Sequence, residues 1–123
     1  MKKVLSSILA LTMILSLGAT AFGAKIPEKP YDNSNFFSYE DYTLHYRVYE
    51  AKGEEKNQIL LIHGFCLSTA TFEGLAEIYA ENGYKTVLVD VPNFGYSSRE
   101  TDNMKLLDRE DVIYALMEYL GGS

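Results

Sequence analysis

The sequence predicts one small domain of the α/β class, with helices on both faces of a sheet in three layers, α/β/α. Residues 59–62 and 86–89 are unbroken apolar runs of the kind found in strands buried on both faces of a parallel sheet. A pattern typical of an amphipathic helix separates these runs. Ahead of them, residues 36–50 alternate between apolar and polar side chains, as a half-buried strand does. We therefore expect a β-hairpin followed by strand, helix, strand and helix.

The N-terminus has the layout of a signal peptide. Two lysines precede an apolar run at residues 4–17 that ends in small residues. This run is shorter than the ~20 residues of a membrane-spanning helix and breaks at Gly18. We expect residues 1–24 to be removed, with cleavage after Ala21 or Gly23, and the mature protein to be secreted or periplasmic without a membrane anchor.

The next segment should lead into the hairpin. Residues 25–35 are polar and contain two prolines, so we expect an extended lead-in without structure of its own. Residues 36–39 should pair with the strand at residues 42–49. One face of that strand carries apolar side chains, which are Tyr42, Leu44, Tyr46 and Val48. The other face is more polar, so His45 is expected to be a solvated surface histidine.

The second half should alternate strands and helices. Residues 59–62 are expected to form a central strand. In the helix that follows, Ser68 or Thr69 is placed to cap the start and Gly83 to end it. Its expected apolar stripe is Phe72, Leu75, Ala76 and Tyr79. After the strand at 86–89, a long loop leads to a last helix, which two glycines close. The apolar stripe of that helix is Val112, Ile113, Leu116, Tyr119 and Leu120.

Composition excludes several classes of protein. The 123 residues carry a formal net charge of −6, so a basic nucleic-acid-binding surface is not expected. The single cysteine, Cys66, excludes an internal disulfide. Ten tyrosines and six phenylalanines supply apolar surface for a folded core and argue against disorder. No motif predicts a metal or cofactor site.

Two motifs carry chemical information. The first is the run 59–66, in which a strand ends in His63-Gly64. The second is the run 87–99, in which a strand ends at Asp90 and a Gly-Tyr-Ser turn follows. In this order and spacing the motifs resemble the α/β-hydrolase family. The resemblance implies that residues 36–123 are the N-terminal half of such a domain, that the protein is a hydrolase, and that its substrate is a small ester.

The His63-Gly64 turn suits acyl transfer, in which negative charge develops on a carbonyl oxygen. Backbone N–H donors placed at that oxygen stabilise the transition state by roughly 3–4 kcal/mol. Glycine after a buried strand lets the backbone turn without a Cβ clash, which leaves the next N–H free to face a cleft. The resemblance implies that the Phe65 N–H is an oxyanion-hole donor and that His63 braces the loop. The alternative is that His63-Gly64 only turns the chain.

Two other residues are weaker candidates. Cys66 would need a positioned base to act as a nucleophile, and His63 lies across a turn, so a buried small side chain is the preferred interpretation. Ser97 begins a Gly-x-Ser pattern that ends in arginine, whereas a nucleophile elbow needs glycine there. We interpret residues 95–99 as a loop. A triad of Ser97 with His63 and Asp90, at the ends of neighbouring strands, is a minor alternative.

The resemblance also implies what this chain lacks. In the family the nucleophile follows a fifth strand, and the acid and the base come later, so we expect no triad here and no activity of the chain by itself. The strand at 86–89 should lie between the hairpin and the strand at 59–62. The far edge of residues 59–62 would then be open, which favours self-association.

Three hypotheses follow from these residues. The leading one is a serine esterase or lipase whose oxyanion loop this chain supplies. The second is a truncated product or gene fragment that acts, if at all, as a complementing or binding module. The third is a relative of epoxide hydrolases and dehalogenases, which typically have proline at the position of Cys66.

Overall fold

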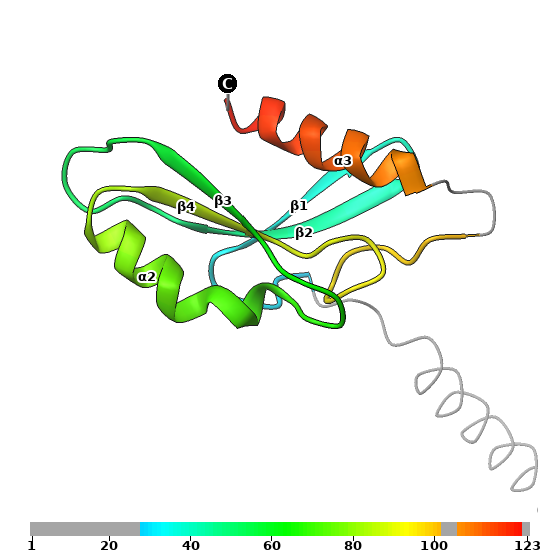
Figure 1. Cartoon of the computed structure of the whole chain (residues 1–123), viewed down its shortest axis with the longest axis horizontal. Coiled ribbons are helices and arrows are strands. Elements are labelled where there is room, and N and C mark those ends of the chain that lie inside the picture. Colours follow the sequence, from blue (N-terminus) through cyan, green and yellow to red (C-terminus); the bar gives the residue numbers. More distant parts are fainter. Residues whose placement is uncertain (1–27, 102–105, 122–123) are drawn as a thin grey trace, which may run out of the picture.

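The computed structural model describes residues 28–101 and 106–121 (Figure 1). The signal-peptide prediction falls outside these residues, and no helix within them is long and apolar enough to cross a membrane. In chain order the elements are β1 (Ser34–Tyr39), β2 (Tyr42–Tyr49), β3 (Gln58–Ile62), the short 3₁₀ helix η1 (Thr69–Phe72), α2 (Glu73–Glu81), β4 (Lys85–Val89) and α3 (Leu106–Tyr119). The hairpin and the β-α-β-α order are as predicted.

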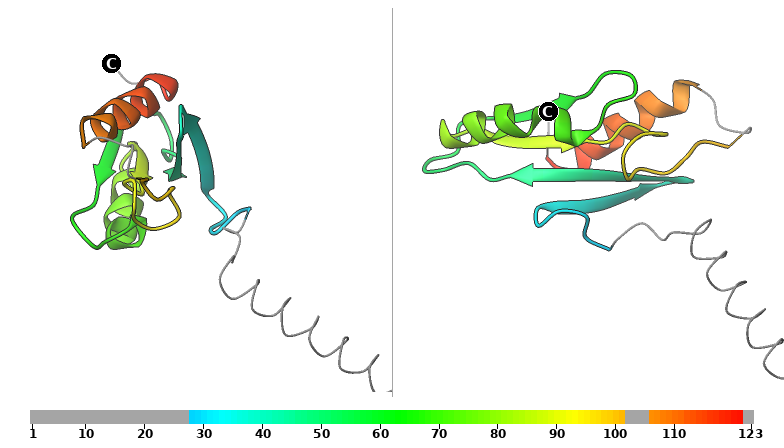
Figure 2. Two further views of the ribbon diagram at one scale, coloured as in Figure 1. Left: turned by 90° about the vertical axis from the view of Figure 1, so that its right-hand side faces the viewer. Right: turned by 90° about the horizontal axis from the view of Figure 1, so that it is seen from below.

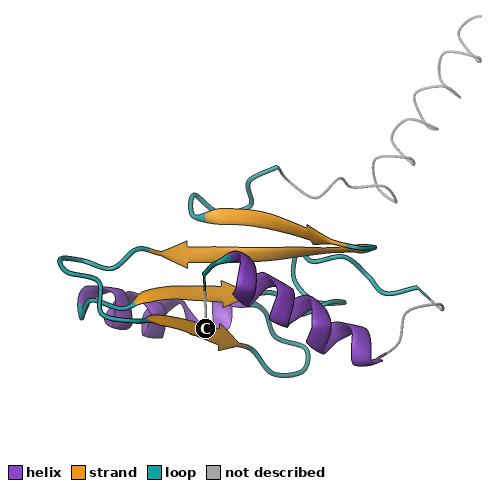
Figure 3. Ribbon diagram, turned by 90° about the horizontal axis from the view of Figure 1, so that it is seen from above, coloured by secondary structure: helices purple, strands orange, loops and turns teal. Residues whose placement is uncertain are grey.

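The four strands form one sheet in the order β1-β2-β4-β3. β1 pairs antiparallel with β2, and β2 pairs antiparallel with β4. β3 and β4 are parallel, with Leu60 opposite Val87. The helices α2 and α3 lie on opposite faces of the sheet (Figure 2 and Figure 3), which confirms the three-layer prediction. Because β3 and β4 are parallel, the loops that follow them lie at the same end of the sheet.

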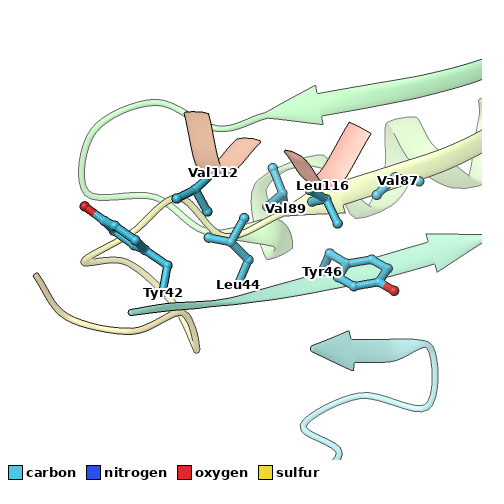
Figure 4. Packing of buried hydrophobic residues seen from close by; sticks show 7 residues of the cluster. All are labelled: Tyr42, Leu44, Tyr46, Val87, Val89, Val112 and Leu116. Carbon is cyan, nitrogen blue, oxygen red and sulfur yellow. The ribbon is translucent and has the colours of Figure 1, made fainter. Parts of the chain in front are cut away.

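The apolar core lies between the sheet and α3. Its buried side chains come from β2, β4 and α3, as Figure 4 shows, and are Tyr42, Leu44, Tyr46, Val87, Val89, Val112 and Leu116. The alternation predicted for the apolar face of β2 is therefore confirmed. Full burial of one such side chain contributes ~1.5–3 kcal/mol. Burial of Tyr119 is not observed, because this residue of α3 is 67% exposed even though its ring lies 5.0 Å from that of Phe37.

The opposite face of β2 is also buried, which contradicts the prediction for His45. His45 is fully buried and Arg47 is 6% exposed. The lead-in covers this face: the Tyr31 ring lies 3.8 Å from the Arg47 guanidinium, and Arg47 Nε donates to Asn33 Oδ1 at 2.9 Å. From the other side, Arg47 pairs with Glu73 of α2 at 2.6 Å. The prediction of an unstructured lead-in is therefore wrong for its last residues, because buried polar side chains need partners.

The first helical segment begins at a cap that the sequence predicts. Ser68 is extended, and its hydroxyl accepts a hydrogen bond from the Ala70 N–H at the start of η1. In α2 the buried residues are Ala76 and Ala80, so the helix approaches β4 through small side chains. Leu75 was expected in the buried stripe but is 38% exposed. Gly83 follows the helix with φ of +91°, a conformation that favours glycine.

β3 is the edge strand of the described sheet. Its residues are half-buried or exposed, and Ile62 is 50% exposed. The prediction of burial on both faces and a central position is therefore wrong for the described residues, because none of them pairs with the outer edge of β3. The place of β4 between the hairpin and β3 is as the family resemblance implied.

Candidate active site

The loop that follows β3 makes a tight turn at the carboxyl end of the sheet. Leu67 N–H donates to the Gly64 carbonyl at 3.2 Å, and Cys66 has φ of +61°. This is the conformation that the third residue of a type II turn requires. Phe65 is the second residue of the turn, and its side chain is 85% exposed. Among the described residues no group accepts the Phe65 N–H, so this donor is unused in the described structure.

His63 joins this turn to the end of β4. Its Nε2 accepts the Val91 N–H at 3.0 Å, so the ring proton is on Nδ1, which donates to the Gly64 carbonyl at 2.7 Å. Both ring nitrogens are therefore engaged with the backbone, and the side chain is buried. In these contacts His63 orients the loop and has no lone pair left for accepting a proton from a nucleophile.

A pocket of about 210 Å³ lies beside the turn, and it is lined by His63, Gly64, Phe65, Val91, Phe94 and Arg109. The Phe94 ring lies edge-on to both Phe65 and His63, with ring centroids 5.6 and 5.7 Å apart. The pocket is thus walled mainly by aromatic rings and backbone. It suits an apolar group next to Phe65, whose N–H has no acceptor among the described residues.

Among the described residues that line this pocket, Arg109 is the one cation, and it already has a partner. Arg109 donates through two guanidinium nitrogens to the Glu100 carboxylate, and Asn93 Nδ2 donates to the same carboxylate at 2.9 Å. These hydrogen bonds, the one from Arg109 first, hold the pKa of Glu100 below its usual range despite partial burial. Glu100 is therefore charged, and the Arg109 charge is neutralised within the protein rather than presented to a ligand.

Behind the pocket, Asp90 is the centre of a buried polar network. Its Oδ1 accepts the Thr69 N–H at 2.8 Å, and its Oδ2 accepts the Tyr96 N–H at 2.9 Å and lies 2.7 Å from His45 Nδ1. Burial alone raises the pKa of Asp90, but the hydrogen bonds from His45 and the two backbone amides outweigh it and lower the pKa. The carboxylate is therefore ionised although it is fully buried.

The network extends to a serine. Ser34 Oγ lies 2.6 Å from His45 Nε2, so Ser34, His45 and Asp90 have the hydrogen-bond order of a catalytic triad. The site is closed, however. Ser34 is buried, its Oγ also accepts the Tyr31 N–H at 3.0 Å, and the rings of Tyr31, Phe36 and Tyr96 surround His45. This set of residues ties the lead-in to the sheet and leaves no room for a substrate.

The structure places Ser97 away from the role of a nucleophile. Its hydroxyl donates to the Asp90 carbonyl and accepts the His45 N–H at 2.9 Å, and the residue is buried. Asp90 contacts His45 rather than His63, so Ser97, His63 and Asp90 do not form a triad in the described structure. Residues 95–99 form a loop, as predicted.

Cys66 is exposed, which contradicts the expected buried position. It occupies the position of the turn that has the left-handed backbone conformation. Within residues 28–101 and 106–121, no group of three His, Cys, Asp or Glu side chains could hold a metal ion.

A family model described as alpha/beta hydrolase fold matches residues 57–123, more than half of the chain. The chain belongs to the α/β-hydrolase fold family. No match was found among curated proteins.

Solved structures agree with this assignment. A probable hydrolytic enzyme from Pseudomonas aeruginosa PAO1 is 25% identical, with a TM-score of 0.61 over 72% of this chain and 29% of that chain. The epoxide hydrolase of Aspergillus niger is 23% identical, with a TM-score of 0.62 over 72% and 25%. A haloalkane dehalogenase from Paraglaciecola agarilytica NO2 is 20% identical, with a TM-score of 0.64 over 77% and 33%. The chain spans about a quarter to a third of the length of these structures.

In this α/β-hydrolase chain, sequence reasoning identified the turn but missed the network behind it. His63, Gly64 and Phe65 are brought together at the end of β3, next to Val91. The pairing of His45 with Asp90 joins residues 45 positions apart, and periodicity within one strand does not predict it. The signal that was available is the position of Asp90 directly after a buried strand, where a carboxylate needs several donors.

Proposed function

We propose that this chain supplies the oxyanion loop and half of the sheet of an exported carboxylic ester hydrolase of the serine type. The observation that carries the proposal is the N–H of Phe65, which no described residue accepts, in an exposed, pocket-lining residue directly after Gly64 at the carboxyl end of a parallel strand. In ester hydrolysis through an acyl-enzyme, a serine attacks the ester carbonyl and negative charge develops on its oxygen. The Phe65 N–H would donate to that oxygen, with His63 holding the turn in place.

The remaining catalytic groups are part of the same proposal. The described residues bring no serine and histidine together at the pocket, so the nucleophile, its base and the second N–H donor would come from further sheet elements. The aromatic walls formed by Phe65 and Phe94 favour an ester with an apolar acyl or alcohol group. An epoxide or haloalkane substrate is a lesser candidate. Two of the structural neighbours act on such substrates, but this chain has Cys66 where relatives of that type typically have proline.

The test compares two variants that both lack the Phe65 ring and differ in the proposed donor. Proline at the second position of a type II turn keeps the turn and lacks an N–H, so Phe65→Pro deletes the donor and Phe65→Ala is the matched control. Both changes are made in a chimera in which residues 28–121 replace the equivalent segment of a complete esterase of the family. We expect kcat of the proline variant to fall about 10²–10³-fold below that of the alanine variant. Equal kcat values in two folded chimeras would contradict the oxyanion role.

The isolated chain offers a second test. We expect the purified chain to show no turnover of short-chain p-nitrophenyl esters, because the hydroxyl of Ser97 is bound to backbone groups and lies in the core. Turnover that Ser97→Ala abolishes would contradict this proposal.

A second candidate function is a binding or complementing module that accepts a strand from a partner or from a second copy. The observation that favours it is the open edge of β3, next to a mainly apolar hollow of about 520 Å³ between this edge and α3. Addition of a strand would satisfy the free backbone groups of the edge and cover Ile62. We expect light scattering to detect association of the purified chain, and Ile62→Lys to prevent it. A chain that stays monomeric at every concentration would exclude self-association.

A further inference from the structure

We infer that Asp90 is the positioning residue of the oxyanion loop, acting through the N–H of Thr69. The inference deepens the proposed function and rests on it for the chemical role of Phe65. It stands on the contacts at the two ends of the loop, on the groups that hold the Asp90 carboxylate, and on residues 64–68, whose hydrogen bonds in the described structure all stay within residues 63–71.

The loop from His63 to Thr69 is attached at both ends to consecutive residues. At its start, His63 Nε2 accepts the N–H of Val91 at 3.0 Å. At its end, the Thr69 N–H donates to Asp90 Oδ1 at 2.8 Å, and Thr69 is buried. The residues between, 64–68, are exposed or half-exposed. Apart from the contact between the Phe65 and Phe94 rings, the position of the Phe65 amide relative to the sheet therefore depends on these two hydrogen bonds at the end of β4.

The Asp90 carboxylate is itself held in place. Its Oδ2 accepts a hydrogen bond from the Tyr96 N–H at 2.9 Å and lies 2.7 Å from His45 Nδ1. A Cβ at Gly95 would lie 2.2 Å from the Asp90 carboxyl carbon, so only glycine allows the loop 95–99 to approach this closely. The carboxylate thus has donors from β2, from the start of η1 and from the loop after β4. It joins the loop carrying the proposed donor to the rest of the sheet.

The negative charge is needed because all of these groups donate. Asparagine has the shape of aspartate, but its amide nitrogen cannot accept a hydrogen bond. In an Asp90→Asn variant, therefore, either Thr69 or the pair of Tyr96 and His45 loses its acceptor. A buried donor without an acceptor is costly, so the amide orientation that leaves one donor unpaired is favoured over the orientation that leaves two unpaired. Thr69 then loses its acceptor, and the far end of the loop is released. Misplacement of an oxyanion donor by about 1 Å lowers the rate by about 10²-fold, so this attachment matters for the proposed chemistry.

The chain carries its own reporter for the test. Cys66 is the only cysteine, is exposed, and lies in the turn itself. A nitroxide label on Cys66 of the full chain reports the mobility of the loop by electron paramagnetic resonance. For Asp90→Asn we expect the mobile fraction of the spectrum to rise about twofold or more under conditions in which urea titration shows the protein still folded.

Two further variants separate a positioning role from general destabilisation. Thr69→Pro removes the N–H that Asp90 accepts, together with the threonine hydroxyl, and leaves Asp90 itself unchanged. Proline suits the first residue of a helix, and Ser68 is already extended, as a residue before proline must be. The control is Thr86→Val, which removes a buried hydroxyl bonded to the Tyr84 carbonyl at the other end of β4. We expect the proline variant to mobilise the label as Asp90→Asn does, and the valine variant to leave the spectrum unchanged.

Each outcome decides the inference. Unchanged label mobility in either Asp90→Asn or Thr69→Pro, or an equal rise in Thr86→Val, would overturn it. If Asp90→Asn does not fold, the proline variant alone carries the test, since it leaves the carboxylate charge in place. The label reports loop order and not catalysis, so failure here is distinct from failure of the oxyanion role, which the Phe65→Pro chimera tests separately.

Discussion

Gly95→Ala should be among the most damaging additions of a single methyl group to this domain. Gly95 has φ of +53°, and a Cβ there would lie 2.2 Å from both the carboxyl carbon and Oδ2 of Asp90. Contacts this short require movement of one of the two residues. The carboxylate cannot move freely, because His45 and the amides of Thr69 and Tyr96 all donate to it in a buried position.

Two costs add in this variant. A residue with a Cβ pays ~1–2 kcal/mol for the left-handed backbone conformation. Displacement of the Asp90 carboxylate breaks at least one hydrogen bond to a charged group, which costs about 1.5–3 kcal/mol. We therefore expect the free energy of unfolding to fall by about 2.5–5 kcal/mol. That is a large part of the total for a small domain, which is typically about 5–15 kcal/mol.

The assay is urea unfolding followed by far-ultraviolet circular dichroism. The matched control is Gly53→Ala, because Gly53 has φ of +75° but nothing lies within 4 Å of its Cβ. In this control the free energy of unfolding should fall only by the ~1–2 kcal/mol that the left-handed backbone conformation costs a residue with a Cβ. The difference between the two variants measures the contact with Asp90. Equal losses of stability in both would refute the claim that Asp90 is held rigidly.

Three further predictions concern stability and export. Leu44→Ala should lower the free energy of unfolding by ~2–5 kcal/mol in urea titration, because Leu44 is fully buried in the core; a loss below the range would show a core that collapses around the cavity. The pKa of Asp90 is lower in the folded state than its unfolded value of about 4, so its stabilisation is complete above that pH and disappears as the pH falls through the folded pKa. The stability gap between the wild type and Asp90→Asn should accordingly narrow on acidification from neutral pH, and a constant gap would mean that Asp90 is not ionised. Expression of the whole chain in an exporting bacterium should yield a product that begins after Ala21 or Gly23, and N-terminal sequencing that finds Met1 would contradict the export proposal.

Periodicity predicted which residues share a face of the sheet, but not what covers that face. Leu44 and Val89 were correctly expected in the core, because alternation and apolar runs follow directly from strand geometry. His45 was expected in water because its neighbours on that face are polar. The structure covers this face with the lead-in and with the loop after β4, which are distant in sequence. A contact between residues so far apart depends on the tertiary fold rather than on a local pattern.

In the candidate site, too, local sequence patterns predicted some features and missed others. The turn at Gly64 was predictable, because glycine at the end of a buried strand has a local conformational reason. The exposure of Cys66 was not, since a residue other than glycine in the left-handed region carries no clear sequence signal. The exposure of Ile62 also escaped local reasoning, because an apolar strand has the same pattern whether or not another strand pairs with its edge.

The docking of Tyr31 and Asn33 on Arg47 sets the N-terminal limit of any shortened version of this protein. A fragment that begins at β1 would leave the Arg47 guanidinium without its contacts to Tyr31 and Asn33. It would also lack the Tyr31 N–H that donates to the Ser34 hydroxyl. Affinity tags and protease sites therefore belong upstream of Tyr31. Only a few positions then separate the proposed leader cleavage site from the first residue that the folded domain requires.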